Sequence, residues 1–190
     1  WPTMMPSIYT AEDALFLSPD LLGGKAANLA WMTREGFPVP RWWVVTTAAF
    51  KQLLSENGLS DWIEQSLTGF NHSEDLTALE PIAAAIREKI LAATIPQSLT
   101  QELKQFFGQL ENVYFAVRSS VLGEDAQGAS FAGQMDSYLF QRGLTAIEES
   151  LLQVCASAFN TRALQYRLTK GIALTDIRAA VIIQEMIEGE

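Results

Sequence analysis

Apolar residues recur at helical spacing through most of the first 112 residues of the chain. The segment AANLAWMTREG, residues 26–36, places Leu29 and Met32 on one face and reaches a glycine at position 36. Apolar positions three or four residues apart, followed by glycine, are typical of an amphipathic helix and its end. The first part of the chain is therefore expected to be mostly helical.

Two further segments of this part also predict helices. Thr46 or Thr47 is expected to cap the periodic run TAAFKQLLSENG, because threonine is a favoured residue at the start of a helix. Residues 75–93 form a second periodic run, in which Pro81 is expected in the first turn, where a missing N–H is tolerated. Between the helices, VPRWWVVTT is a short run of β-forming residues, and adjacent Trp42 and Trp43 should point to opposite faces of a strand.

The pattern changes at residue 113. VYFAVRSS and SYLFQR read as strands, and AAVIIQEMI reads as a buried strand. Apolar residues between Leu151 and Leu164, Cys155 among them, recur at helical spacing and predict one long helix. The change divides the chain into a mostly helical first subdomain, residues 1–112, and a β-rich second subdomain, residues 113–190.

Composition limits the function classes. The 190 residues carry a net charge of -9, and their 13 basic residues are scattered, which argues against a nucleic-acid surface. No apolar run approaches the ~20 residues that span a bilayer, and the N-terminal residues lack the features of a signal peptide. The single cysteine excludes an internal disulfide, so a cytoplasmic location is expected. The first residue is Trp rather than Met, which suggests that the chain is part of a longer protein.

Lys25 follows two glycines in LLGGKAANL and is a candidate phosphate ligand. Exposed backbone N–H groups at the start of a helix favour an anion, and a lysine beside them adds a full charge. The segment is not a P-loop, because Pro19 and Ala26 occupy positions where that motif needs Gly and Ser or Thr. The alternative is a solvated lysine on a turn.

Arg118 is a second candidate, because in FAVRSS it follows three apolar residues and precedes two hydroxyl residues, Ser119 and Ser120. A buried arginine needs an anionic partner, and its planar guanidinium group suits phosphate oxygens. An internal salt bridge with Glu124 or Asp125 is the alternative. The next segment, GEDAQGASFAG, is punctuated by glycines, as in loops that close over a nucleotide, although a surface loop has the same composition.

These segments together resemble a known family. GGKAANL, GFPVPRWWVVTTAAF, FAVRSSVLGEDAQGASFAGQMDSYLF, FNTRALQYR and AAVIIQEMI follow the order and approximate spacing found in the nucleotide-binding region of phosphoenolpyruvate synthase. This region is shared with pyruvate phosphate dikinase and the rifamycin phosphotransferases. The resemblance covers nearly the whole chain and implies an α+β, ATP-grasp-like fold, with a small, mainly antiparallel sheet.

The resemblance also implies roles for particular residues. Lys25 and Arg118 would bind the phosphates of ATP, while Gly133, Ser137 and Gln184 would lie along the nucleotide. The acidic and glutamine residues that hold Mg²⁺ in the family belong to a later subdomain. No residue of this chain is therefore expected to be catalytic or to bind metal.

The implied reaction is transfer of phosphate from ATP, with release of AMP and phosphate, to a histidine on another domain and then to pyruvate. His72, the only histidine here, does not resemble that phosphohistidine, so this chain alone is expected to be inactive. Three alternatives remain open: a rifamycin-type acceptor, a regulatory module that binds nucleotide without catalysis, and a structural domain that binds none. Departures from the family pattern at Val121, Leu122 and Gly123 are the only support for the regulatory module.

Overall fold

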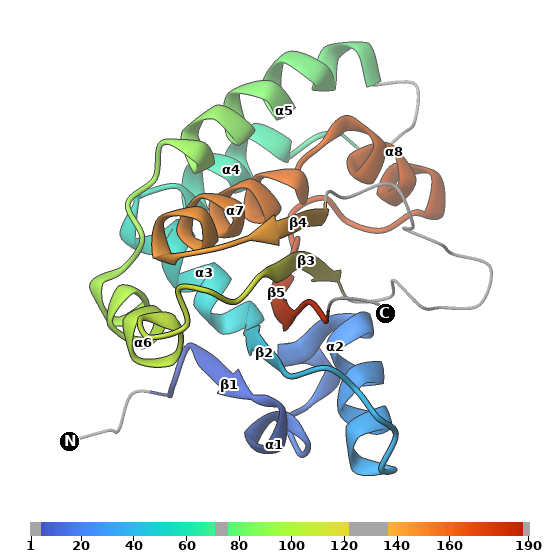
Figure 1. Ribbon diagram of the computed structural model, residues 1–190. Coiled ribbons are helices and arrows are strands. Elements are labelled where there is room, and N and C mark those ends of the chain that lie inside the picture. The colour runs from blue at the N-terminus through green and yellow to red at the C-terminus, as the bar shows by residue number, and fades with distance from the viewer. Residues whose placement is uncertain (1–4, 71–75, 122–136, 188–190) are drawn as a thin grey trace.

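The computed structural model describes residues 5–70, 76–121 and 137–187. A five-stranded sheet crosses the middle of the molecule, with helices on both sides (Figure 1). Every pair of neighbouring strands is antiparallel. In spatial order, the strands are β1 (Ile8–Thr10), β2 (Trp42–Val45), β5 (Ala179–Glu185), β3 (Phe115–Val121) and β4 (Ser137–Gln141).

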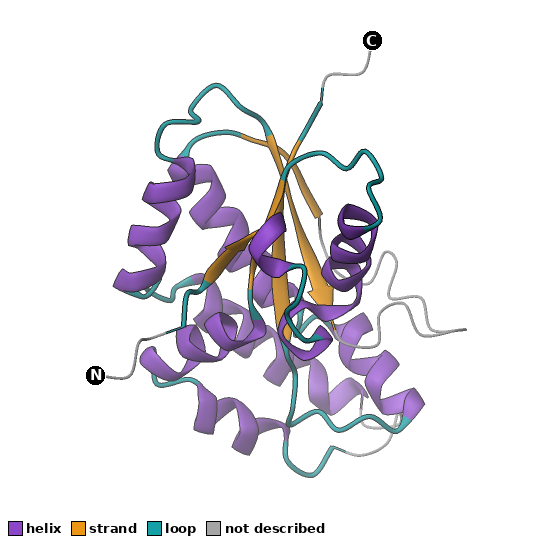
Figure 2. Cartoon of the chain, turned by 90° about the horizontal axis from the view of Figure 1, so that it is seen from below, coloured by secondary structure: helices purple, strands orange, loops and turns teal. Residues whose placement is uncertain are grey.

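The helices account for most of the remaining described residues, and Figure 2 shows them surrounding the strands. They are α1 (Ala11–Ala14), α2 (Pro19–Arg34), α3 (Thr47–Glu56), α4 (Ser60–Leu67), α5 (Leu76–Leu91), α6 (Gln97–Phe107), α7 (Leu144–Ser157) and α8 (Thr161–Lys170). None of these described helices has the length and apolarity needed to cross a membrane.

The sheet buries both faces in separate cores. Trp43 and Val117 point into the larger core, which is shared with α3 to α8. Trp42 and Ile182 point into a smaller core, which is shared with α1 and α2. Because side chains alternate along a strand, the adjacent tryptophans enter different cores, as the sequence predicts.

The α+β class and the strands predicted at residues 113–120, 137–142 and 179–187 are confirmed within one or two residues at most ends. Thr46 is the cap of α3, because its hydroxyl oxygen accepts a hydrogen bond from the backbone N–H of Ala49 at 3.3 Å. Cys155 is buried in the larger core.

Two helix predictions are wrong in detail. The single long helix predicted around Leu151 to Leu164 is two helices, because the side chain of Asn160 accepts a hydrogen bond from the N–H of Ala163 and starts α8. Pro81 lies inside α5 rather than in its first turn. A proline inside a helix leaves the carbonyl oxygen four residues earlier without its intrahelical donor, and because Thr77 and Pro81 are exposed, water can supply the missing hydrogen bond.

The division into subdomains at residue 112 stays a prediction. Strands from both sides of that boundary pair with each other, since β2 and β3 both pair with β5. The glycine-rich loop predicted at residues 123–133 and His72 lie outside the described residues.

Candidate functional site

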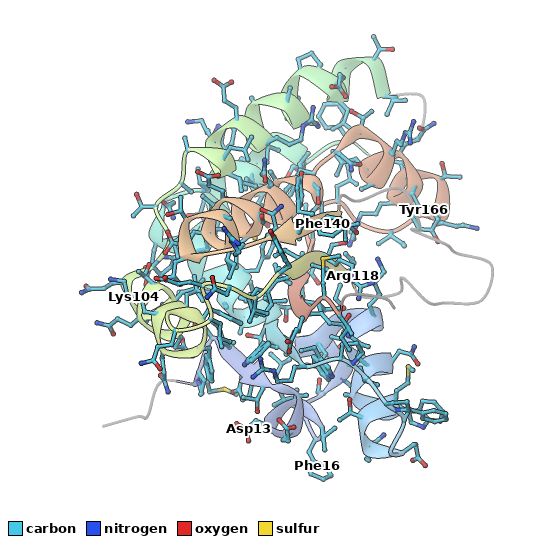
Figure 3. All side chains as sticks on the ribbon, in the orientation of Figure 1. Asp13, Phe16, Lys104, Arg118, Phe140 and Tyr166 are labelled. Carbon is cyan, nitrogen blue, oxygen red and sulfur yellow. The ribbon has the colours of Figure 1, made fainter. Side chains whose placement is uncertain are left out.

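Arg118 lies on β3, on the face of the sheet that α2 covers. It is opposite Ile182 of β5, and Ile182 belongs to the same core as Leu22 and Ala26 of α2. Residues directly opposite each other in antiparallel strands point to the same face. Figure 3 shows Arg118 at the level of the sheet, between α7 and α2.

The guanidinium group of Arg118 is only partly satisfied. Its Nη2 donates a hydrogen bond to Oε1 of Gln184, whereas its Nε is buried and has no partner among the described residues. A buried donor without a partner costs about 1–3 kcal/mol, and more when the group is charged. An anion that accepted a hydrogen bond from Nε would remove this cost.

The segment that carries Lys25 is a helix interrupted by a glycine. The hydroxyl oxygen of Ser18 accepts a hydrogen bond from the N–H of Asp20, and the helix starts at Pro19. At Gly23 the backbone turns to φ 72° and ψ 176°, which breaks the helical path. A second helical stretch begins directly after Gly23, so the predicted helix start at the glycines is confirmed. The earlier stretch, which Ser18 and Pro19 begin, was not predicted.

Ser120 fixes this kinked turn against β3. Its hydroxyl donates a hydrogen bond to the carbonyl oxygen of Leu22 at 2.7 Å and accepts one from the N–H of Ala26 at 3.0 Å. A Cβ atom at Gly23 would lie 2.4 Å from the backbone oxygen of Ser120, so only glycine permits this approach. The partly buried Lys25 lies between these two hydrogen-bonded positions. The turn is therefore held two residues along β3 from Arg118.

Two other predicted ligands share the face of Arg118. Ser137 lies directly opposite Arg118 on β4, at the exposed edge of the sheet. Gln184 is buried, and its Nε2 donates a hydrogen bond to the carbonyl oxygen of Pro40 at 3.3 Å. The structure thus brings Arg118, Ser137 and Gln184 together beside the turn that carries Lys25. Gly133 lies outside the described residues.

Gly23 and Ser120 were missed as site residues by the sequence interpretation. The signal for Gly23 is the doubled glycine itself, since one of the pair supplies the turn and the close contact. Ser120 gave only a weak signal, a hydroxyl residue within a buried strand. Its role depends on a partner 98 residues away, which local sequence patterns do not reveal.

The described residues do not provide a metal site. They contain no group of three or more His, Cys, Asp or Glu side chains placed to hold a metal ion. The carboxylate of Glu185, at the end of β5, forms an ion pair with Arg41 at 2.8 Å. Among the described residues, no cluster of side chains alone would hold Mg²⁺.

The site brings together a lysine on a hydrogen-bonded turn, a partly buried arginine whose Nε is buried and has no partner among the described residues, a hydroxyl and an amide. Such an arrangement is of the kind that suits an anion such as a phosphate group. Residues 19–190 match the sequence profile described as "Pyruvate phosphate dikinase, AMP/ATP-binding domain". The chain belongs to this family.

Several curated relatives have similar sequences. The chain is 32% identical over 176 residues to the "Probable phosphoenolpyruvate synthase" of Methanothermobacter thermautotrophicus, covering 90% of this chain and 26% of the relative. It is 33% identical over 179 residues to the "Phosphoenolpyruvate synthase" of Escherichia coli, with 90% and 22% covered. It is also 33% identical over 169 residues to the "Rifampicin phosphotransferase" of Bacillus subtilis, with 88% and 19% covered. The chain therefore spans about a fifth to a quarter of the length of these relatives.

Proposed function

We propose that this chain forms the N-terminal part of the ATP-binding site of a phosphoenolpyruvate synthase-like phosphotransferase with an ATP-grasp-like fold. Membership of an AMP/ATP-binding family supports the nucleotide. The observation that carries the proposed site is the buried Nε of Arg118, which has no partner among the described residues and lies beside the Lys25 turn.

In this proposal each residue has a distinct role. Arg118 and Lys25 neutralise phosphate charge, and the Ser120 hydrogen bonds hold the Lys25 turn in place before ATP binds. Gln184 orients Arg118 through the hydrogen bond between their side chains and borders the nucleotide. Ser137 and Gly133 complete the proposed contacts. Such positioning and charge neutralisation are the main contributions a protein makes to phosphoryl transfer.

The activity of the whole protein is also a proposal. Phosphate from ATP would reach a histidine on another domain, with release of AMP and phosphate, and then pyruvate. Mg²⁺ would be held by residues outside this chain, so the chain alone should bind ATP weakly without turnover. A cytoplasmic location is part of the same proposal. Transfer to a rifamycin-type acceptor is the second candidate, supported by the similarity to a rifampicin phosphotransferase.

The phosphate role of Arg118 is tested by comparing ATP with adenosine, which lacks phosphates, as ligands in calorimetric titrations. The Arg118→Gln variant should bind ATP about 10-fold to 100-fold more weakly, the equivalent of one or more charged hydrogen bonds. Its affinity for adenosine should not change. Arg162→Gln removes the same charge from an exposed position on α8 and should leave both affinities unchanged.

Circular dichroism establishes that each variant is folded before titration. Equal weakening of ATP and adenosine binding would contradict a phosphate role for Arg118, and no binding of either by the unmodified chain would contradict the site. Phosphoryl transfer is tested in the full-length protein with Mg²⁺ and ATP labelled on the β-phosphate. Acid-labile label on the protein together with AMP supports the proposed reaction. Nucleotide binding without label or AMP would favour the regulatory module.

A further inference from the structure

Two adjacent threonines stand where β2 ends and α3 begins, and their hydroxyl groups have different partners. Thr46 is the cap of α3, since its hydroxyl oxygen accepts a hydrogen bond from the backbone N–H of Ala49. Thr47, the first residue of α3, is buried, and its hydroxyl donates a hydrogen bond of 2.7 Å to the carbonyl oxygen of Asp20 on α2. Because Thr46 already caps α3, the hydroxyl of Thr47 is available to bind another helix.

The first stretch of α2 depends on such contacts. It covers only residues 19–22, because the non-helical glycine that follows interrupts the helix. The last carbonyl groups of a helical stretch have no partner within it, so they need donors from elsewhere. Thr47 supplies the donor for Asp20, and Ser120 supplies the donor for Leu22 at 2.7 Å. Two hydroxyl groups from outside α2 therefore bind this short stretch.

The two hydroxyl groups are held by different strands of the sheet. Ser120 lies on β3, and Thr47 follows the last residue of β2, Val45, by two positions. β2 and β3 pair with β5 on either side of it, so the same sheet fixes both donors. A single contact would allow the stretch to pivot, whereas two contacts also fix its direction. The direction of this stretch sets where the turn places Lys25.

We propose that Thr47 is a positioning residue of the ATP site: its hydroxyl holds the first stretch of α2 so that Lys25 meets the phosphates of ATP without rearrangement. This role rests on the proposed function and deepens it, because Thr47 acts through Lys25 and has no contact with ATP. A binding group that is already held in place loses less conformational freedom when the ligand binds, so the affinity is higher. Without the Thr47 hydroxyl, ATP binding itself must order the turn.

Thr47→Val tests this role, because valine keeps the shape of threonine and replaces the hydroxyl with a methyl group. In calorimetric titrations the variant should bind ATP about 3-fold to 10-fold more weakly, the equivalent of one neutral hydrogen bond, and should bind adenosine as tightly as the unmodified chain. Thr47→Ala also lacks the hydroxyl and should show the same selective loss. Thr47→Ser keeps the hydroxyl and should bind ATP to within about twofold of the unmodified chain.

Thr46→Val is the matched control, because it makes the same change at the adjacent buried position and removes the cap of α3. It should lower the midpoint of urea unfolding, as Thr47→Val does, but leave the affinity for ATP unchanged. Lys25→Met tests the proposed function itself, since it removes the charge that Thr47 positions, and it should weaken ATP binding more than Thr47→Val does. Circular dichroism establishes that each variant is folded before titration.

Four results would each overturn the role of Thr47. They are unchanged ATP affinity in Thr47→Val and Thr47→Ala, equal weakening of ATP and adenosine binding, no recovery in Thr47→Ser, and an equal loss of ATP affinity in Thr46→Val. If Lys25→Met still weakens ATP binding, the phosphate role of Lys25 stands and only the role of Thr47 fails. If Lys25→Met does not change the affinity for ATP, the phosphate role of Lys25 fails and the role of Thr47 fails with it.

Discussion

Replacing Gly23 with alanine should destabilise the protein and weaken its proposed ATP site together. With φ 72° and ψ 176°, Gly23 occupies a region of backbone conformation that is nearly restricted to glycine, and another residue there costs about 1–3 kcal/mol. The new Cβ would also lie 2.4 Å from the backbone oxygen of Ser120 and 2.5 Å from its carbonyl carbon. Because backbone atoms cannot rotate away, α2 must move from β3.

That movement breaks the two hydrogen bonds of the Ser120 hydroxyl, to Leu22 and from Ala26, which contribute about 1 kcal/mol each. The total loss for Gly23→Ala is therefore about 3–5 kcal/mol, a large fraction of the ~5–15 kcal/mol that stabilises a typical domain. Any variant that remains folded should also bind ATP more weakly, because the Lys25 turn is displaced.

The assay is urea unfolding followed by circular dichroism, with Gly36→Ala as the matched control. Gly36 also has a positive φ, 83°, but its added Cβ would meet nothing within 4 Å. In the Gly36→Ala control, the free energy of unfolding should therefore fall only by the cost of the left-handed backbone conformation, about 1–2 kcal/mol. If Gly23→Ala is no more destabilising than Gly36→Ala, the close contact with Ser120 does not hold the turn and the reasoning is refuted.

Three further predictions concern parts of the fold away from this turn. Glu102→Gln should lower the free energy of unfolding by about 1–2 kcal/mol and speed amide hydrogen exchange at Ile8. The reason is that the Glu102 carboxylate accepts hydrogen bonds from the N–H groups of Ser7 and Ile8. An unchanged exchange rate at Ile8 would contradict this prediction. Phe107→Ala should lower the free energy of unfolding, measured in urea, by about 3–5 kcal/mol, because Phe107 is buried in the larger core. A loss below ~1 kcal/mol would show that neighbouring side chains fill the space left by the ring. Burial raises the pKa of the Cys155 thiol from 9.0 to about 12, so only the unfolded chain releases this proton between those values. The contribution of the protonated Cys155 thiol to the free energy of unfolding is complete below about pH 9 and is lost as the pH rises towards 12. Between these pH values, the free energy of unfolding of Cys155→Ala should therefore fall less steeply than that of the unmodified chain.

Local sequence patterns predict the strands well because those strands are buried and rich in β-forming residues. The run AAVIIQE is apolar on both faces, as expected for a strand covered by two cores. The break before α8 was missed because apolar spacing continues across it. Asn160 nevertheless carries the signal, since it is a favoured cap immediately before a helical run.

The candidate site could be predicted only in part. Lys25 and Arg118 stand out by residue type. A lysine after two glycines adds a charge where backbone N–H groups favour an anion, and an arginine in an apolar strand needs an anionic partner. Their placement on one face cannot be derived from local patterns, since it depends on Ser120 bonding to a turn 98 residues away. The contact between Arg118 and Gln184 likewise joins two strands whose order in the sheet does not follow the sequence.

The central position of β5 has a consequence for how the protein folds. β5 separates β2 from β3, so without it the strands that precede it can form only two unconnected pairs, β1 with β2 and β3 with β4. Gln184 on β5 bonds to Pro40, 144 residues earlier, and contacts so distant in sequence form slowly. During synthesis on the ribosome, the edges of β2 and β3 that face β5 therefore stay unpaired until residues 179–185 have emerged, and unpaired strand edges are prone to aggregation.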